Sequence, residues 1–273
     1  MKNIWEPVTI KNNETYYWHF KNVSFWIEKN DNIWQYSLEY SYETSDEKDI
    51  IIAKKTRKPP DLSWNSVISS KESVSLALKP AMPDRPVVVH SLKPFKILGN
   101  TNYRFYTSIP LWLTAFSGED TSDPLFEIPS VVMSPTWYGG ATTGKLCYTS
   151  NMHFDISTDL VETSPVSAYC PIIVKNLSRQ SFVIGKIAIF TDLLSVYRLP
   201  RVGNDIEVSE STTVLWTNEA QVIYLGEEKV NISVSEKQTW LRKNPEVVTP
   251  ARLKGKDNIF KKSLILLKEI SNY

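Results

Sequence analysis

The chain has 273 residues, of which 42% are hydrophobic, 12% aromatic and 22% charged, and its formal net charge is +1. This apolar fraction is sufficient for a packed core, which excludes a mainly disordered chain. No apolar run approaches the roughly 20 residues of a membrane-spanning helix, and the first residues lack the apolar stretch of a secretory signal. We therefore expect a cytoplasmic protein without a transmembrane segment of its own.

Short runs that alternate apolar and polar residues follow one another along the chain. Residues 16–20 and 23–28 flank Lys21 and Asn22, which predicts a hairpin. Residues 34–40 alternate aromatic or apolar residues with polar ones, as in a strand with one buried face. The same reasoning predicts further strands over residues 74–78, 86–90, 103–112, 145–148, 167–174, 182–190, 213–216 and 222–225.

This pattern predicts an all-β fold, an antiparallel β-sandwich made of one or two packed units. We expect the sandwich body to cover residues 1–236, and two sandwich-like halves would meet near residues 125–145. Residues 237–273 form a basic C-terminal segment. In that segment Asp257 is a suitable N-cap and apolar residues recur every three or four positions, which predicts a short amphipathic helix over residues 257–270.

The C-terminal segment concentrates positive charge. Nine basic side chains lie between Lys237 and Lys268 against two acidic ones, so the rest of the chain is net negative. Such a segment can fold back on the acidic body or dock on an acidic partner. We expect it to bind a protein partner and no nucleic acid, through seven residues: Arg252, Lys254, Lys256, Phe260, Lys261, Lys262 and Leu264.

Signs of catalytic chemistry are weak. The two cysteines form no Cys-x-x-Cys pair, and no zinc, calcium or phosphate-loop pattern is present. The most reactive combination is Cys147 with His153 and Asp155, because a thiolate needs a base and an acid that orients it. We expect no catalytic residues, no metal and no cofactor, and keep a cysteine hydrolase built on these three residues as an alternative.

Aromatic residues suggest another alternative. The chain has nine tryptophans and thirteen tyrosines. We expect most of the tryptophans in strands to fill the space between two sheets, namely Trp18, Trp26, Trp34 and Trp112. Rings exposed on a sheet would instead stack on sugars or on protein side chains, which would make the protein a carbohydrate- or small-ligand-binding sandwich.

Three blocks of sequence occur in an order that resembles a known family. They are residues 5–7 with 17–20 and 23–27, residues 136–139 with 144–148, and residues 171–178 with 193–197 and 215–217. Together they resemble the prokaryotic domain of unknown function 432. The resemblance covers most of Trp5–Leu225, departs from the family at Tyr138, where phenylalanine is usual, and leaves the basic tail after Lys237 outside the pattern.

The resemblance implies a prokaryotic cytoplasmic protein without an assigned enzymatic activity. The family's genes lie near mechanosensitive channel genes in some genomes, which suggests a place at the inner membrane through a channel partner. Our leading prediction is therefore a non-enzymatic β-sandwich interaction module. The sequence does not indicate its oligomeric state.

Overall fold

The computed structural model describes residues 4–20, 22–41, 51–70, 73–118, 122–142, 144–161, 164–198, 215–226, 229–234 and 245–253. These residues form β-strands and two single-turn 3-10 helices, Thr158–Leu160 (η1) and Thr191–Leu193 (η2). The prediction of an all-β, sandwich-like fold is confirmed. The helix expected over residues 257–270 lies outside the described residues, and the division into a body and a basic segment stays a prediction.

The chain forms two compact units, and each is built from separate stretches of sequence. Among the described residues, unit 1 contains residues 4–81 and 110–132. It has a five-stranded sheet in the order β5-β2-β3-β4-β6, with strands Ile51–Thr56, Glu14–Phe20, Val23–Asn30, Ile33–Tyr40 and Asn65–Ile68. A four-stranded sheet in the order β1-β7-β10-β11 consists of Val8–Thr9, Ser75–Ala81, Trp112–Ser117 and Pro124–Pro129.

Aromatic rings from the two sheets of unit 1 pack against each other. Trp18 of β2 and Phe25 of β3 are direct cross-strand partners and are fully buried. From the other sheet, the ring of Phe126 lies 5.9 Å from that of Phe25 and 4.0 Å from that of Tyr36. The hairpin and the alternating strand predicted in this region are confirmed, because the residues with the apolar period face the second sheet.

Unit 2 contains the described residues 82–109, 133–198 and those after residue 214. Its single eleven-stranded sheet has the order β15-β8-β13-β9-β14-β17-β16-β20, with β12 beside β13, β18 beside β14 and β19 beside β18. In chain order, β8, β9 and β12 to β20 are Val87–Ile97, Thr101–Pro110, Ser134–Tyr138, Lys145–Asp155, Ser167–Asn176, Phe182–Ile189, Val196–Arg198, Leu215–Thr217, Ala220–Gly226, Lys229–Val234 and Glu246–Thr249.

Strand β13 divides this sheet into two arms. Its residues 148–153 pair with β8 and its last two residues pair with β9. Rings then connect the two arms: Phe95 of β8 lies 4.9 Å from Phe105 of β9, and Phe182 of β15 lies 4.3 Å from Tyr224 of β18. Most strand pairs are antiparallel, but β13 runs parallel to β8, and β14 runs parallel to β17 and β18.

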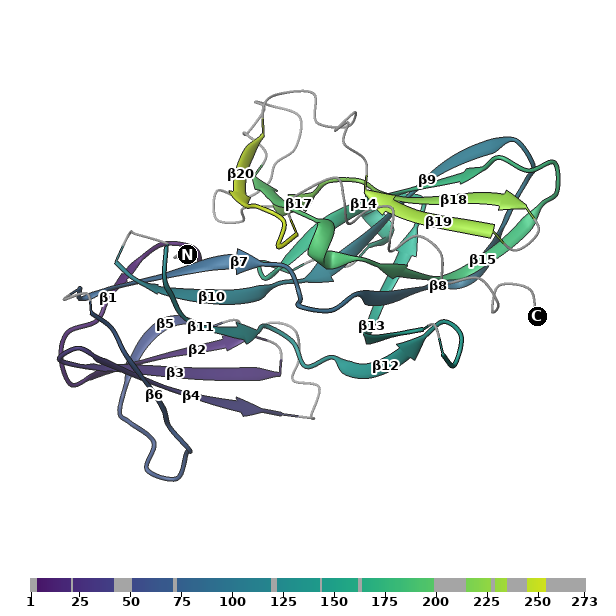
Figure 1. Cartoon of the computed structure of the whole chain (residues 1–273). Helices are drawn as coiled ribbons and strands as arrows, with labels where there is room; N and C mark the ends of the chain where they lie inside the picture. The colour runs from purple at the N-terminus through teal and green to yellow at the C-terminus, as the bar shows by residue number, and fades with distance from the viewer. Residues whose placement is uncertain are drawn as a thin grey trace. The chain divides into compact units, whose positions relative to one another are not determined.

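Three turns lie at one end of unit 2 (Figure 1), and two of them join strands that are not hydrogen-bonded to each other. They connect β8 to β9, β14 to β15 and β18 to β19. The backbone N–H of Asn100 in the first turn donates a hydrogen bond to the carbonyl oxygen of Ser178 in the second, at 2.9 Å. The N–H of Leu177 donates to the carbonyl oxygen of Tyr224, next to the third turn, at 2.8 Å. Backbone hydrogen bonds therefore connect the first two turns with the end of β18.

The side-chain amide of Asn176, which is fully buried, organises these turns. Its Nδ2 donates to the carbonyl oxygens of Leu98 at 2.9 Å and Gln180 at 2.7 Å. Its Oδ1 accepts hydrogen bonds from the backbone N–H of Ser178 at 3.0 Å and from the Ser178 hydroxyl at 2.8 Å. One amide thus satisfies backbone groups of two turns, which would otherwise be left without partners.

A glycine allows the same two turns to touch. A Cβ atom added at Gly99 would clash with the backbone of Arg179, at its carbonyl oxygen. The added Cβ atom would have a position fixed by its own backbone, and the atoms that it meets are backbone atoms of Arg179. Rotating a side chain therefore cannot relieve the clash. Close approach, rather than an unusual backbone angle, explains the glycine at this position.

We expect Asn176→Ala to lower the free energy of unfolding by about 2 kcal/mol, because it leaves buried carbonyl groups unpaired. Urea unfolding followed by circular dichroism measures this change. Asn102→Ala, at an exposed position on β9, is the control and should change stability by less than about 0.5 kcal/mol. Equal stabilities of the two variants would contradict this role of Asn176.

Candidate functional site: the leucine tip of unit 2

The structure separates the three residues of the cysteine-hydrolase alternative. Cys147 is only 1% exposed, and its Sγ donates to the carbonyl oxygen of Lys145 at 3.5 Å. Burial raises the pKa of the Cys147 thiol to about 11. His153 lies six residues further along the same strand, which at roughly 3.3 Å per residue places it more than a hydrogen bond away. A nucleophilic cysteine needs the opposite, an accessible thiol with a lowered pKa, so the geometry gives this alternative no support.

Two histidines and a lysine form a row across three neighbouring strands of unit 2. His90 of β8 is the register partner of His153 on β13 and of Lys186 on β15. Burial lowers the pKa of His90, and the positive charges of Lys186 and His153 lower it further. Within the described residues, no three histidine, cysteine or acidic side chains lie close enough to hold a metal ion. The surroundings of His90 in this row therefore disfavour its protonated form.

Of the seven predicted partner-binding residues, Arg252 is described. Its guanidinium donates to the carbonyl oxygen of Met82 from Nε at 3.1 Å and from one Nη at 2.7 Å. The next residue, Leu253, donates its N–H to the carbonyl oxygen of Asp192 at 2.9 Å. Two residues of the basic segment, Arg252 and Leu253, thus contact unit 2. Its role in partner binding stays a prediction for the residues outside the described part of the chain: Lys254, Lys256, Phe260, Lys261, Lys262 and Leu264.

The tryptophans are divided between core and surface. Trp18 and Trp34 are fully buried, as expected, whereas Trp26 and Trp112 are half-buried. Trp26 faces away from the core because it pairs with Tyr17 on the outer side of the five-stranded sheet, in alternation with the buried Phe25. In unit 2, Trp137 is 53% exposed.

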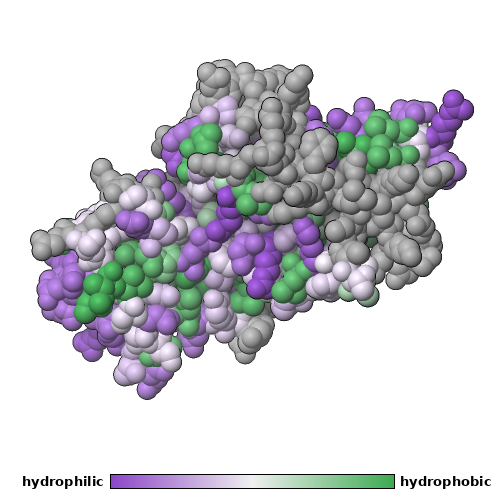
Figure 2. All heavy atoms as spheres, in the orientation of Figure 1, coloured by the Kyte–Doolittle hydropathy of each residue, from purple (hydrophilic) through white to green (hydrophobic). Residues whose placement is uncertain are grey.

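The three turns at the end of unit 2 present a group of exposed aliphatic side chains. We call this group the leucine tip and define it as Leu98, Leu177, Val183 and Leu225. Their exposed fractions are 53%, 57%, 45% and 44%. Figure 2 shows hydrophobic side chains gathered over the β9 and β18 end of unit 2, next to strongly hydrophilic ones. Exposed apolar side chains gathered at one end of a unit are typical of interaction sites.

Backbone contacts place the members of the leucine tip at the same end of unit 2, with Leu98 and Val183 on one arm of the sheet and Leu177 and Leu225 on the other. Leu98 follows Ile97, the cross-strand partner of Phe182, and Val183 comes directly after Phe182. Leu177 is hydrogen-bonded to the residue that precedes Leu225. Because the buried amide of Asn176 fixes the turns, the leucines are held at the end of the sheet rather than in the core.

The sequence analysis did not identify the leucine tip. Each leucine stands within a turn signature, in Leu98-Gly99-Asn100, Asn176-Leu177-Ser178 and Leu225-Gly226. An apolar residue inside a turn signature is a recognisable signal, since turns normally carry polar residues. What the sequence could not reveal is that three such turns lie at one end of unit 2. In the part of the chain that the structure describes, no helix has the length and apolarity needed to cross a membrane.

Both cysteines should be inert in the folded protein. Burial raises the pKa of Cys170 to about 12, and Cys147 is similarly shielded. We expect iodoacetamide at pH 8 to label neither thiol in native protein and both in 6 M guanidinium, as counted by mass spectrometry. Rapid native labelling of Cys147 would revive the hydrolase alternative.

The lowered pKa of His90 predicts an acid-sensitive unit 2. The unfolded chain takes up a proton near pH 6.5 before folded His90 does, so stability that is present above that pH is lost as the pH falls. We expect the free energy of unfolding to decrease from pH 7.5 to pH 5.5. His90→Gln should weaken that decrease, and identical pH profiles for variant and wild type would contradict the assignment.

Comparison with known proteins identifies a family. Residues 4–268 match the family model described as a protein of unknown function, DUF432. The match extends past Leu225 and through most of the basic tail, so the expectation that this tail lies outside the family pattern is wrong. No curated protein and no solved structure matches the chain. Since the family model covers nearly the whole sequence, the chain belongs to the DUF432 family.

Proposed function

We propose that this chain is a non-enzymatic interaction module that binds a protein partner through the leucine tip. The observation that carries the proposal is a group of exposed aliphatic side chains at one end of unit 2, where backbone hydrogen bonds join two turns and the end of β18. A preformed apolar surface gives up little conformational entropy when a partner binds it. The basic C-terminal segment, two residues of which contact the same unit, supplies a second contact.

The charges around the leucine tip favour an acidic partner. Lys96 and Arg179 are exposed beside it, and Lys175 is half-buried. The sequences of the three turns contain acidic residues only at Glu227 and Glu228. An apolar centre with a basic rim complements an apolar partner surface with an acidic rim, and such complementarity mainly sets partner choice and association rate.

The cytoplasmic part of a mechanosensitive-type membrane channel is the partner we propose to test first. The support is the gene neighbourhood that the family resemblance implies, together with a surface suited to docking. On this proposal the protein is prokaryotic and cytoplasmic, lies at the inner membrane through its partner, and binds no nucleic acid.

We expect the double variant Leu98→Ser/Leu177→Ser to bind the purified cytoplasmic part of such a channel at least tenfold more weakly than wild type. Serine removes apolar surface without changing charge or the turn backbone. Leu160→Ser is the matched control, because Leu160 is 63% exposed on η1 of the same unit. Isothermal titration calorimetry measures the affinities, and equal affinity for all three proteins would refute the role of the leucine tip.

The contribution of the basic segment needs a separate deletion. Removing residues 254–273 leaves Arg252 and Leu253 with their hydrogen bonds to unit 2. We expect weaker and less salt-sensitive binding after this deletion, since charged contacts are screened by salt. Unchanged affinity and salt dependence would restrict the interface to the leucine tip.

A further inference from the structure

A second surface, in unit 1, carries aromatic rings where polar residues are expected. The inner face of the five-stranded sheet packs against the four-stranded sheet, so its outer face should be polar. Tyr17 of β2 and Trp26 of β3 nevertheless point outward as cross-strand partners, with ring centroids 4.9 Å apart. Both rings are half-buried. The core does not need them, because Trp18 and Phe25 already fill the inner side of the same strands.

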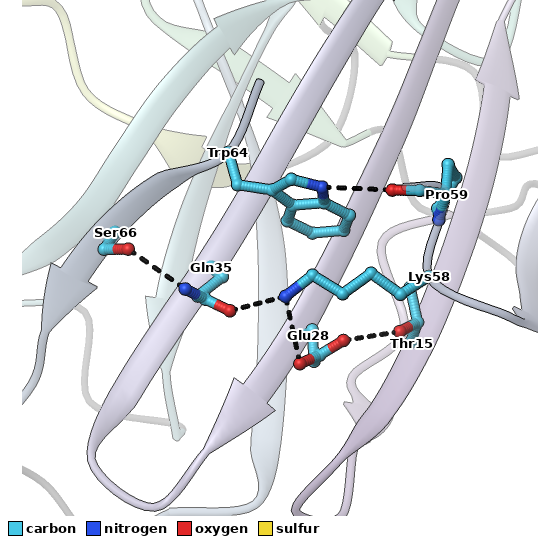
Figure 3. A network of polar contacts seen from close by, with 7 residues as sticks. All are labelled: Thr15, Glu28, Gln35, Lys58, Pro59, Trp64 and Ser66. Atoms are coloured by element: carbon cyan, nitrogen blue, oxygen red, sulfur yellow. Dashed lines mark hydrogen bonds and ion pairs between the residues drawn. The ribbon is translucent and has the colours of Figure 1, made fainter. Parts of the chain in front are cut away.

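A third ring is held over the same outer face by the connection between β5 and β6 (Figure 3). The Nζ atom of Lys58 lies 4.4 Å from the centroid of the Trp64 indole, and Trp64 Nε1 donates to the carbonyl oxygen of Pro59 at 3.4 Å. The hydroxyl of Ser37 on β4 donates to the carbonyl oxygen of Ser63 at 2.7 Å, which ties the connection to the sheet. The plane of the Trp64 ring is therefore fixed from several directions.

A continuous chain of polar contacts lies beneath that indole (Figure 3). Lys58 Nζ donates to Gln35 Oε1 at 2.7 Å and to Glu28 Oε1 at 3.2 Å. The second oxygen of Glu28 accepts a hydrogen bond from the Thr15 hydroxyl at 2.8 Å, and Gln35 Nε2 donates to Ser66 at 3.3 Å. The one lysine and the one carboxylate of this network thus neutralise each other.

The rest of the outer face is also balanced in charge. Lys54 is the register partner of Tyr17, and Glu39 is the partner of Ser24, so these two charges oppose each other in sign. Between them, the hydroxyl of Ser24 is hydrogen-bonded to the Tyr17 hydroxyl at 3.2 Å and to His19 Nδ1 at 3.0 Å. The rings are therefore bordered by groups that can both donate and accept hydrogen bonds, without an excess of either charge.

We propose that this aromatic face, formed by Tyr17, Trp26 and Trp64, binds a neutral oligosaccharide or polysaccharide built from hexoses with equatorial hydroxyls. Such a sugar presents a flat face of C–H groups, whose weak positive polarity suits the negative face of an indole or phenol ring. Its hydroxyls lie at the rim, within reach of paired polar side chains. Among the residues of this face that the structure describes, lysines and carboxylates cancel, so a charged polymer would find no excess of opposite charge on them.

The rings are held in place before a ligand binds, which favours a ligand that binds by stacking on them. A ring that is already held in one orientation pays little entropy when a sugar stacks on it. Trp64 meets this condition through Lys58 and Pro59, and Trp26 meets it through Tyr17. This site lies in unit 1 and does not depend on the protein-binding role proposed for the leucine tip of unit 2.

The test uses the full chain and soluble sugars. Cellohexaose and laminarihexaose serve as neutral probes, and an oligogalacturonate of similar length serves as the charged probe. Isothermal titration calorimetry measures binding, and tryptophan fluorescence provides a second readout. We expect saturable binding of at least one neutral hexasaccharide and no comparable binding of the oligogalacturonate.

Matched tryptophan variants locate the binding. Trp64→Ala should raise the dissociation constant at least tenfold, and Trp64→Phe, which keeps a ring, should retain most of the affinity. Trp137→Ala, which removes an exposed tryptophan of unit 2, should bind as wild type does. Circular dichroism checks that each variant folds, and Tyr17→Phe, which removes only a hydroxyl, gives a milder test with an expected loss of two- to fivefold.

Several outcomes would overturn the proposal. One is the absence of saturable binding by every neutral probe. Others are binding that survives Trp64→Ala unchanged, equal losses in Trp64→Ala and Trp137→Ala, and tighter binding of the charged probe. All of these can be distinguished from failure at the leucine tip, because Leu98→Ser/Leu177→Ser should leave sugar binding intact.

Discussion

The hydrogen bonds of one buried amide hold the functional end of unit 2 together. Asn176 stands at the end of β14, where the chain turns toward β15, and its side chain also reaches the carbonyl oxygen of Leu98 in another turn. Neither turn could bury its carbonyl groups without this partner, because unpaired polar groups are costly to bury. The contact also explains why leucines are exposed there: the backbone is fixed by a polar group, and the apolar side chains are left at the outside.

The two units use aromatic residues differently. In unit 1, rings from both sheets fill the core, and further rings lie on the outer face with a polar network beneath them. In unit 2, rings join the two arms of one sheet, while the leucine tip is aliphatic. A flat aromatic face suits a ligand that stacks, and an aliphatic tip suits a surface that is buried on docking. The two proposed activities therefore rest on different chemistry in different units.

Local patterns in the sequence predicted the strands well, because alternation with a period of two reports directly which residues are buried. The hairpin of β2 and β3 follows from such a pattern, since its two strands are neighbours along the chain.

The parallel pairing of β13 with β8 could not be predicted, because the strands are about 60 residues apart and no turn fixes their register. The position of Leu177 at the end of unit 2 could not be predicted, since it depends on a hydrogen bond to Tyr224, which is remote in sequence. The pairing of Trp26 with Tyr17 on the outer face was not predicted, because the number of aromatic residues does not indicate which face of a sheet a tryptophan occupies.

The alternation of the two units along the chain imposes an order on synthesis. β8 and β9 are made immediately after β7, yet the strands that pair with β8, namely β13 and β15, are made only after β10 and β11 have completed the second sheet of unit 1. During translation, β8 and β9 therefore emerge from the ribosome with apolar faces and unsatisfied edges, while unit 1 can already close. Correct folding therefore requires that the later strands pair with β8 and β9 before the unpaired edges of these strands pair with another chain. The same interleaving means that neither unit corresponds to one continuous gene fragment.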